Sequence, residues 1–202
     1  KGFGFDCSSV PELVLARRIG SAGEDIMFTS NNTRTKQFQT AMDKGGAILN
    51  LDDLSLIRKL PHVPEQICFR YNPGPERSGN HIIGNPVEAK YGLTREQLYT
   101  AYETAIQMGV KRFGIHTMLA SNELNHTYMV ETADMLLDVI SELHRKLSIR
   151  FEFINIGGGL GIPYSPEDAP FDLAAMARDI GHSLAEFKKI NAWVPRLYME
   201  SG

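Results

Sequence analysis

Segments with strand-like and helix-like patterns alternate along the whole chain, and this alternation constrains the fold more than any other feature. Seven short runs rich in β-branched and aromatic residues are expected to be strands, at residues 3–7, 26–29, 47–49, 66–71, 111–116, 149–155 and 196–199. Six helices are expected between them, beginning near residues 9, 33, 51, 94, 125 and 172. This pattern predicts an α/β fold with a parallel sheet, either doubly wound or a (β/α)8 TIM-type barrel. Seven strands and six helices fit an incomplete barrel lacking one βα unit better than a compact open sheet.

The expected helices carry sequence signals for their ends and for their buried faces. Ser9 is expected to cap the first helix with Pro11 in its first turn, and Thr94 to cap a helix that reaches Met108. The two long helices near the end of the chain have apolar stripes at helical spacing. These stripes are Val130, Ala133, Leu137, Ile140 and Leu143 in one, and Leu173, Met176, Ile180, Leu184 and Phe187 in the other.

Composition narrows the class of protein without naming a function. The 202 residues are 43% hydrophobic and carry a formal net charge of −3, which gives no reason to expect nucleic acid or an anionic membrane as partner. No apolar run reaches membrane-spanning length. Cys7 and Cys68 are expected to be buried thiols of a protein in the reducing cytoplasm. No group of His, Cys, Asp or Glu has metal-ligand spacing, so no metal is expected.

A glycine-rich turn at residues 155–163 follows the sixth expected strand. Its triplet Gly157-Gly158-Gly159 removes side chains from the backbone where the strand ends, so that several N–H groups can converge on one phosphate. A mobile surface turn explains the same triplet equally well. The turn has neither the Gly-Lys-Ser/Thr of a Walker loop nor the spacing of a dinucleotide fingerprint. Taken alone, it indicates a phosphate of a cofactor or substrate and nothing more specific.

Further polar residues follow the other expected strands, at the sheet edge where barrel enzymes carry their chemistry. They are Asp6, Arg70, His116, Ser121 and Glu200. A purely structural role is the alternative for such residues. Arg70 and Asp6 would then form an ion pair, and His116 would be a hydrogen-bonded core residue. Together with the glycine turn, a carboxylate and an arginine on one rim nevertheless make a coherent site.

Six motifs in chain order resemble the barrel of the fold-type III pyridoxal-phosphate (PLP) decarboxylases, which include diaminopimelate, ornithine and arginine decarboxylases. The motifs are Gly2-Phe3-Gly4-Phe5-Asp6-Cys7-Ser8-Ser9 with Glu12, Cys68-Phe69-Arg70, Ala89-Lys90-Tyr91-Gly92, Gly114-Ile115-His116 with Ser121, Asn155-Ile156-Gly157-Gly158-Gly159 and Glu200-Ser201-Gly202. The resemblance covers nearly all 202 residues and is strongest to diaminopimelate decarboxylase. It implies that residues 1–202 are one partial PLP-binding barrel domain of the alanine racemase-like type.

The resemblance also implies a role for each motif residue. Glu200 would face the pyridine nitrogen of the cofactor and keep it protonated, which makes the ring an electron sink. Asp6 and Arg70 would form an ion-paired floor, with Glu12 as a supporting candidate only. The cofactor phosphate would be bound by Gly157, Gly158, Gly159 and Gly202, and Ser121 would donate a hydroxyl near the cofactor.

The chain departs from the family pattern at several points. The family's Schiff-base lysine lies on a strand before residue 1, within the first βα unit, and its C-terminal β-domain is also absent from the chain, so the fragment itself is not expected to be active. Ser201 replaces a proline of the family's motif. Met118 stands where a histidine usually stacks on the cofactor ring, and His116 could stack there instead.

The function implied for the parent enzyme is decarboxylation of meso-diaminopimelate to L-lysine and CO2, with PLP as cofactor, a small-molecule amino acid as substrate and a homodimer as the assembly. The alternatives are another decarboxylase of the ornithine, arginine or carboxynorspermidine type, and a non-catalytic decarboxylase-like regulator that binds a partner protein. Alanine racemase and the small PLP-binding barrel proteins share the barrel, but racemases generally present arginine at the position of Glu200. The intact glycine triplet and Glu200 argue against the regulator.

Overall fold

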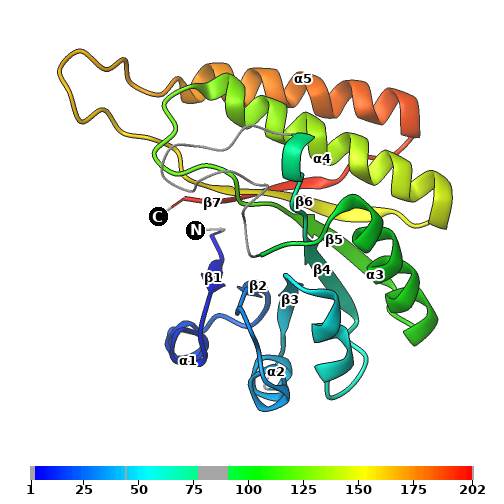
Figure 1. Ribbon diagram of the computed structural model, residues 1–202. Helices are drawn as coiled ribbons and strands as arrows, with labels where there is room; N and C mark the ends of the chain where they lie inside the picture. Colours follow the sequence, from blue (N-terminus) through cyan, green and yellow to red (C-terminus); the bar gives the residue numbers. More distant parts are fainter. Residues whose placement is uncertain (1–2, 44, 77–90, 202) are drawn as a thin grey trace. The chain divides into compact units, whose positions relative to one another are not determined.

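The computed structural model describes residues 3–43, 45–76 and 91–201. Strands and helices alternate along the chain, as Figure 1 shows. In chain order the elements are β1 (Phe5–Cys7), α1 (Val10–Arg18), β2 (Gly23–Phe28), α2 (Thr35–Met42), β3 (Ala47–Leu51), the 3-10 helix η1 (Leu54–Lys59), β4 (Gln66–Arg70), the 3-10 helix η2 (Gly74–Glu76), α3 (Arg95–Met108), β5 (Arg112–His116), α4 (His126–Leu147), β6 (Phe151–Gly158), α5 (Leu173–Asn191) and β7 (Arg196–Glu200).

These elements form two compact units. Unit 1 comprises residues 1–71 and 91–113, and unit 2 comprises residues 72–90 and 114–202, so that the boundary falls within β5. Within unit 1 the strands β1 to β4 follow one another in the sheet in chain order. The pairs β1–β2, β2–β3 and β3–β4 in unit 1 and the pair β6–β7 in unit 2 are all parallel. The predicted α/β class with a parallel sheet is therefore confirmed.

Helix α1 of unit 1 begins where the sequence predicts. Ser9 is its N-cap, Pro11 lies in the first turn, and the Glu12 carboxylate accepts a hydrogen bond from the Ser9 backbone N–H at 3.0 Å. The same carboxylate also accepts from the N–H of Ser8. Glu12 therefore satisfies backbone donors that the helix leaves unpaired, which gives this acid a structural role.

The two acids after β3 have different roles that the sequence did not separate. Asp53 caps η1 and accepts a hydrogen bond from the Ser55 backbone N–H at 2.8 Å. Asp52 is buried instead, and burial raises its pKa, a shift that a backbone hydrogen bond and the charge of Arg70 partly oppose. The segment expected to be a short helix is the 3-10 helix η1, whose tighter turn suits such a short connection.

Helices α4 and α5 of unit 2 pack side by side (Figure 1). Four of the five apolar residues predicted to face inward from α4 are buried; they are Ala133, Leu137, Ile140 and Leu143. In α5, Met176, Ile180 and Phe187 are buried, but Leu173 is exposed. The prediction for Leu173 was wrong because this residue is the first of the helix, where no preceding turn covers it.

Both cysteines lie in unit 1, are free, and have buried side chains, as predicted. Cys7 is 2% exposed, and burial, with a smaller contribution from the nearby Asp6 charge, raises the pKa of its thiol to about 11. Since the thiolate is the reactive form, a buried thiol with a raised pKa is inert.

We therefore expect neither Cys7 nor Cys68 of the native protein to react with a thiol reagent such as DTNB at pH 8, and both to react in denaturant. Stability should also fall as pH rises from 9.0, the ordinary pKa, to about 11, because the unfolded chain then loses the Cys7 proton that the folded chain keeps. Counting the thiols that react with and without denaturant checks the first part. Fast reaction of one thiol in the native protein would contradict the burial.

Candidate functional site

The glycine turn at the end of β6 needs glycine at all three positions because other backbone lies close to it. An added Cβ would lie 2.5 Å from the Thr117 carbonyl oxygen at Gly157, 1.7 Å from the Glu200 carbonyl oxygen at Gly158, and 2.2 Å from the Ala120 carbonyl oxygen at Gly159. Gly157 and Gly159 also have positive φ, of 72° and 88°. The triplet is thus fixed in place by the end of β7 and by the segment after β5, so the alternative of a mobile surface turn does not apply.

Glu200 lies directly beside this turn. Gly158 and Glu200 are register partners of the parallel pair β6–β7, after an irregularity that separates them from the partners Asn155 and Tyr198. The sequence predicts that the triplet binds the phosphate and Glu200 the ring nitrogen of one and the same cofactor. Their adjacency in the sheet meets the geometric condition for that expectation.

Asn155 connects the two parts of the site. Its Oδ1 accepts a hydrogen bond from the Gly157 backbone N–H at 2.9 Å, and its Nδ2 donates to Glu200 Oε1 at 2.8 Å. The side chain is almost completely buried. In the sequence, Asn155 is recognisable only as the first residue of the glycine motif, without a role of its own. The signal for its role was an asparagine two residues before a glycine, the spacing of a turn in which the side chain accepts from the backbone.

His116, at the end of β5, lies against the same carboxylate. Its side chain is 1% exposed, and its Nε2 is 3.2 Å from Glu200 Oε1, whereas the Glu200 side chain is 20% exposed. Neither ring nitrogen makes a well-aligned hydrogen bond with a described residue. The structure therefore places His116 against the acid, where it restricts the movement of the carboxylate.

Met118 and Ser121 contact the turn from the segment after β5. Met118 Sδ accepts a hydrogen bond from the Gly158 backbone N–H at 3.2 Å. Ser121 is a neighbour of Gly159, because a Cβ on Gly159 would lie 2.8 Å from the Ser121 backbone nitrogen. The backbones of Gly159 and Ser121 therefore lie side by side at the turn. Their N–H groups and the Ser121 hydroxyl are candidate donors for an anion.

The remaining predicted site residues belong to unit 1 or lie outside the described part of the chain. The Asp6 carboxylate, in β1, accepts a hydrogen bond from Thr29 Oγ1 at 2.7 Å, and Thr29 Oγ1 in turn accepts from Asn50 Nδ2 at 3.3 Å. Arg70 ends β4 and is half-buried. The expected ion pair between Asp6 and Arg70 stays a prediction, and Gly202 lies outside the described residues.

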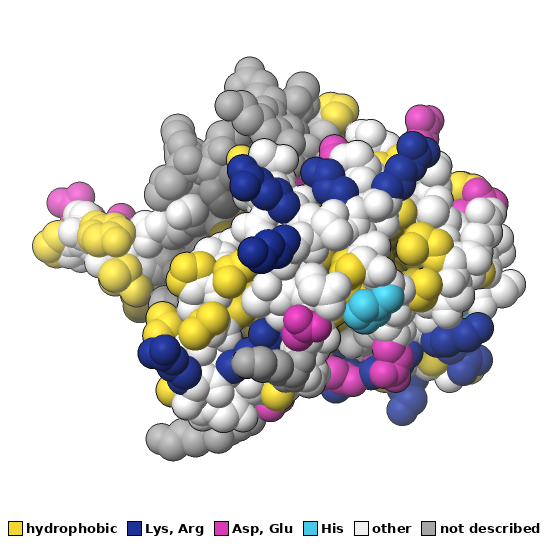
Figure 2. Space-filling view, turned by 90° about the horizontal axis from the view of Figure 1, so that it is seen from below, with side chains coloured by type: hydrophobic (Ala, Val, Ile, Leu, Met, Phe, Trp, Pro, Cys, Tyr) yellow, Lys and Arg dark blue, Asp and Glu magenta, His cyan; other side chains and the backbone are white. Residues whose placement is uncertain are grey.

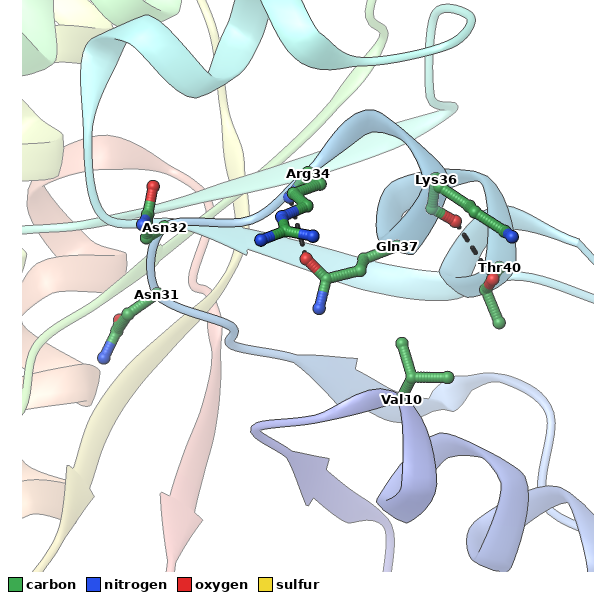
Figure 3. A pocket seen from close by; sticks show the side chains of 7 residues that line it. All are labelled: Val10, Asn31, Asn32, Arg34, Lys36, Gln37 and Thr40. Carbon is green, nitrogen blue, oxygen red and sulfur yellow. Dashed lines mark hydrogen bonds between the residues drawn. The ribbon is translucent and has the colours of Figure 1, made fainter.

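Unit 1 also contains an open hollow of about 460 Å³ beside the beginnings of α1 and α2 (Figure 3). Its lining consists of Val10, Asn31, Asn32, Arg34, Lys36, Gln37 and Thr40. All seven side chains are exposed or half-buried, and Gln37 caps the Arg34 backbone N–H at 2.8 Å. This hollow has the character of a groove between two helix ends, without a buried polar group directed into it.

The features of a membrane-spanning helix and of a metal site are both absent from the described residues. On the face shown in Figure 2, Lys and Arg side chains are mixed with Asp, Glu and apolar ones. Across residues 3–43, 45–76 and 91–201, no helix has both the length and the apolar composition needed to cross a membrane. In the same part of the chain, no three His, Cys, Asp or Glu residues are grouped as metal ligands would be.

The chain is similar to known proteins over its whole length. The family model described as the pyridoxal binding domain of pyridoxal-dependent decarboxylases matches residues 1–202. Protein TabA of Pseudomonas amygdali pv. tabaci is 38% identical over 202 residues, which are 100% of this chain and 47% of the relative. The diaminopimelate decarboxylase of Thermoplasma acidophilum is 32% identical over 192 residues, which are 94% of this chain and 46% of the relative.

Solved structures show the same fold at lower identity. The diaminopimelate decarboxylase of M. jannaschii has a TM-score of 0.86 and 23% identity, covering 98% of this chain and 48% of that one. The arginine decarboxylase of Paramecium bursaria Chlorella virus has a TM-score of 0.73 and 18% identity, covering 100% of this chain and 52% of that one. These likenesses confirm the predicted barrel fold class of the PLP decarboxylases.

The chain spans about half the length of the relatives that it matches. The match of the family model covers every residue, and the glycine turn and Glu200 occupy adjacent positions within it. The chain therefore belongs to the pyridoxal-dependent decarboxylases, and it corresponds to their pyridoxal-binding domain, whose cofactor is pyridoxal phosphate.

Proposed function

We propose that the full-length protein decarboxylates meso-diaminopimelate to L-lysine and CO2, as a step of lysine biosynthesis. The observation that carries the proposal is the adjacency of Gly158 and Glu200 in the β6–β7 pair, with the carboxylate held by Asn155. Several relatives named diaminopimelate decarboxylase support this choice of substrate. We also propose a cytoplasmic homodimer as the form of the full-length protein, on the basis of the family resemblance.

The residues of unit 2 fit the cofactor at both of its polar ends. The phosphate is assigned to the backbone N–H groups of Gly159 and Ser121 and to the Ser121 hydroxyl, because the backbones of these two residues lie side by side at the turn. Glu200 offers a negative charge for the pyridine nitrogen. When bound, the cofactor supplies an electron sink for the pair of electrons left behind as CO2 departs.

The glycine triplet contributes to this site in two ways. The N–H groups of Gly157 and Gly158 already donate to Asn155 and Met118, so they shape the turn. Direct phosphate binding by the Gly158 N–H requires that Met118 Sδ move away. A thioether is a weak acceptor, and a phosphate oxygen is a much stronger one, so this exchange is favourable.

Glu200, positioned by its neighbours, would keep a proton on the pyridine nitrogen of the cofactor, and the chemistry depends on that proton. A carboxylate beside the ring nitrogen favours the protonated form of that nitrogen, because opposite charges stabilise each other. Asn155 and His116 both contact Oε1 of this carboxylate, which restricts its rotation. The resemblance assigns His116 or Met118 to the face of the ring and Asp6, Arg70 and Gly202 to its surroundings, and these roles are part of the proposal.

The proposal is tested by incubating the full-length protein with PLP and one amino acid at a time. Meso-diaminopimelate, ornithine, arginine and carboxynorspermidine are each assayed for CO2, and the product is identified by mass spectrometry. We expect the highest kcat/KM with meso-diaminopimelate and L-lysine as its product. Faster turnover of arginine or ornithine would reassign the substrate within the family, whereas no CO2 from any of them would favour the non-catalytic regulator.

A further inference from the structure

We infer that Asn155 is a positioning residue that links the Glu200 carboxylate to the glycine turn, so that the acid and the phosphate-binding turn act as one rigid unit. The inference deepens the proposed function and rests on it, because it concerns how the PLP site is held together. It starts from two hydrogen bonds of one amide: Gly157 N–H to Oδ1 at 2.9 Å, and Nδ2 to Glu200 Oε1 at 2.8 Å.

The chemistry of the two partners determines which way the amide faces. Gly157 presents an N–H, which needs an acceptor, and Glu200 presents a carboxylate, which needs a donor. Only a side chain with an acceptor and a donor on one short branch satisfies both. Serine can accept from Gly157 but is too short to reach Glu200 as well, and alanine can do neither.

Burial makes these bonds consequential. Asn155 is 2% exposed, so water cannot easily take the place of a lost hydrogen-bond partner. Loss of either bond therefore leaves a buried polar group unsatisfied, which is costly. The bond to Glu200 involves a charged acceptor, which makes it stronger than a bond between neutral groups. The Asn155 amide therefore holds the acid through one of its two oxygens.

The contact that His116 makes with Glu200 also favours Asn155 as the residue that positions the acid. His116 contacts the same oxygen, Oε1, at 3.2 Å, but without a well-aligned hydrogen bond. Of Asn155 and His116, Asn155 thus makes the better-aligned contact with this oxygen. Removing its side chain takes this hydrogen bond from Glu200 and takes from the Gly157 N–H the acceptor that it has in Asn155.

The experiment compares Asn155→Ala and Asn155→Ser with wild type in the full-length protein, with and without Glu200→Ala. The readouts are the dissociation constant of PLP from its absorbance titration, kcat and KM, and the thermal midpoint without cofactor. Asn191→Ala is the matched control, because Asn191 is a half-buried asparagine that donates to the Phe187 carbonyl oxygen at 3.1 Å at the end of α5.

We expect Asn155→Ala to lower kcat about 10- to 100-fold, the effect of losing one hydrogen bond to a charged group, with little change in KM for the amino acid. Its PLP affinity should also fall, because the turn loses a bond. Asn155→Ser should restore part of the PLP affinity through a bond to Gly157 but should keep the low kcat. In the Glu200→Ala background, Asn155→Ala should have almost no further effect on kcat, since the two residues act in series.

The inference is overturned if Asn155→Ala behaves like Asn191→Ala, or if its effect on kcat is as large without Glu200 as with it. If Asn155→Ala does not fold, the serine variant gives the same decision through its kcat. Failure of the proposed function looks different, because the wild type itself then releases no CO2. In that case the PLP titration of the variants still decides whether Asn155 holds the turn.

Discussion

Replacement of Glu200 by alanine in the full-length protein is expected to lower kcat about 100- to 1,000-fold while the protein stays folded, the range seen when one preorganised electrostatic group is removed from an active site. The physical reason is that in the proposed site this carboxylate would stabilise the proton on the cofactor ring, and without that proton the ring is a poor acceptor of electrons. Glu200 is the last residue of β7, and its side chain is partly exposed, so its loss removes little packing.

Two further variants make this test specific. Glu200→Gln keeps an oxygen that can accept from Asn155 Nδ2 but lacks the charge, so its kcat should be as low as that of the alanine variant and its thermal midpoint closer to wild type. Glu152→Gln is the matched control, an acid of the neighbouring strand β6 that lies 3.5 Å from Arg196. Its kcat should be unchanged. Normal turnover by both Glu200 variants would remove the assignment of this residue as the partner of the ring.

Replacement of Gly158 by alanine is expected to lower the free energy of unfolding by about 3 kcal/mol and the thermal midpoint by about 10 °C, or to prevent accumulation of folded protein. The added Cβ would lie 1.7 Å from the Glu200 carbonyl oxygen and 2.9 Å from its carbonyl carbon, and this backbone cannot move without separating β6 from β7. Urea or thermal denaturation of the full-length protein measures the effect.

Gly181→Ala is the control for the Gly158 variant. Gly181 lies in the exposed part of α5, and nothing lies within 4 Å of an added Cβ. Alanine is favoured over glycine in a helix, so this variant should gain about 0.5–1 kcal/mol. Equal stability of the two variants would show that the close approach of β6 and β7 at Gly158 is wrong.

The element order was predictable because its signals are local. Thr94, for example, caps α3 and accepts from the Gln97 backbone N–H at 3.3 Å, and Gly109 ends the same helix with a positive φ of 99°. Such signals depend on residues only a few positions apart, so the sequence alone reveals them. The prediction for Leu173 failed because the surroundings of a residue, and not the helical spacing alone, decide whether it is buried.

The reason for the glycine triplet was not predictable. From the sequence, the triplet indicates free backbone N–H groups, but the structure shows that close contacts with Thr117, Ala120 and Glu200 require it as well. Two of its N–H groups are bonded within the protein, to Asn155 and Met118. Contacts with residues about 40 positions away carry no local signal, and the bond from Asn155 to Glu200 is hidden for the same reason, whereas its bond with Gly157 follows from a local turn spacing.

Strands β6 and β7 carry an aromatic pair and a polar pair at successive positions along the sheet. On β6 and β7, the stacked rings of Phe153 and Tyr198 lie 4.6 Å apart, and the polar pair of Asn155 and Glu200 comes two residues further along each strand. Neighbouring residues of a strand point to opposite faces, so insertion or deletion of one residue between Tyr198 and Glu200 would turn the acid away from Asn155. The number of residues between the aromatic pair and the acid is therefore as important to the site as the acid itself.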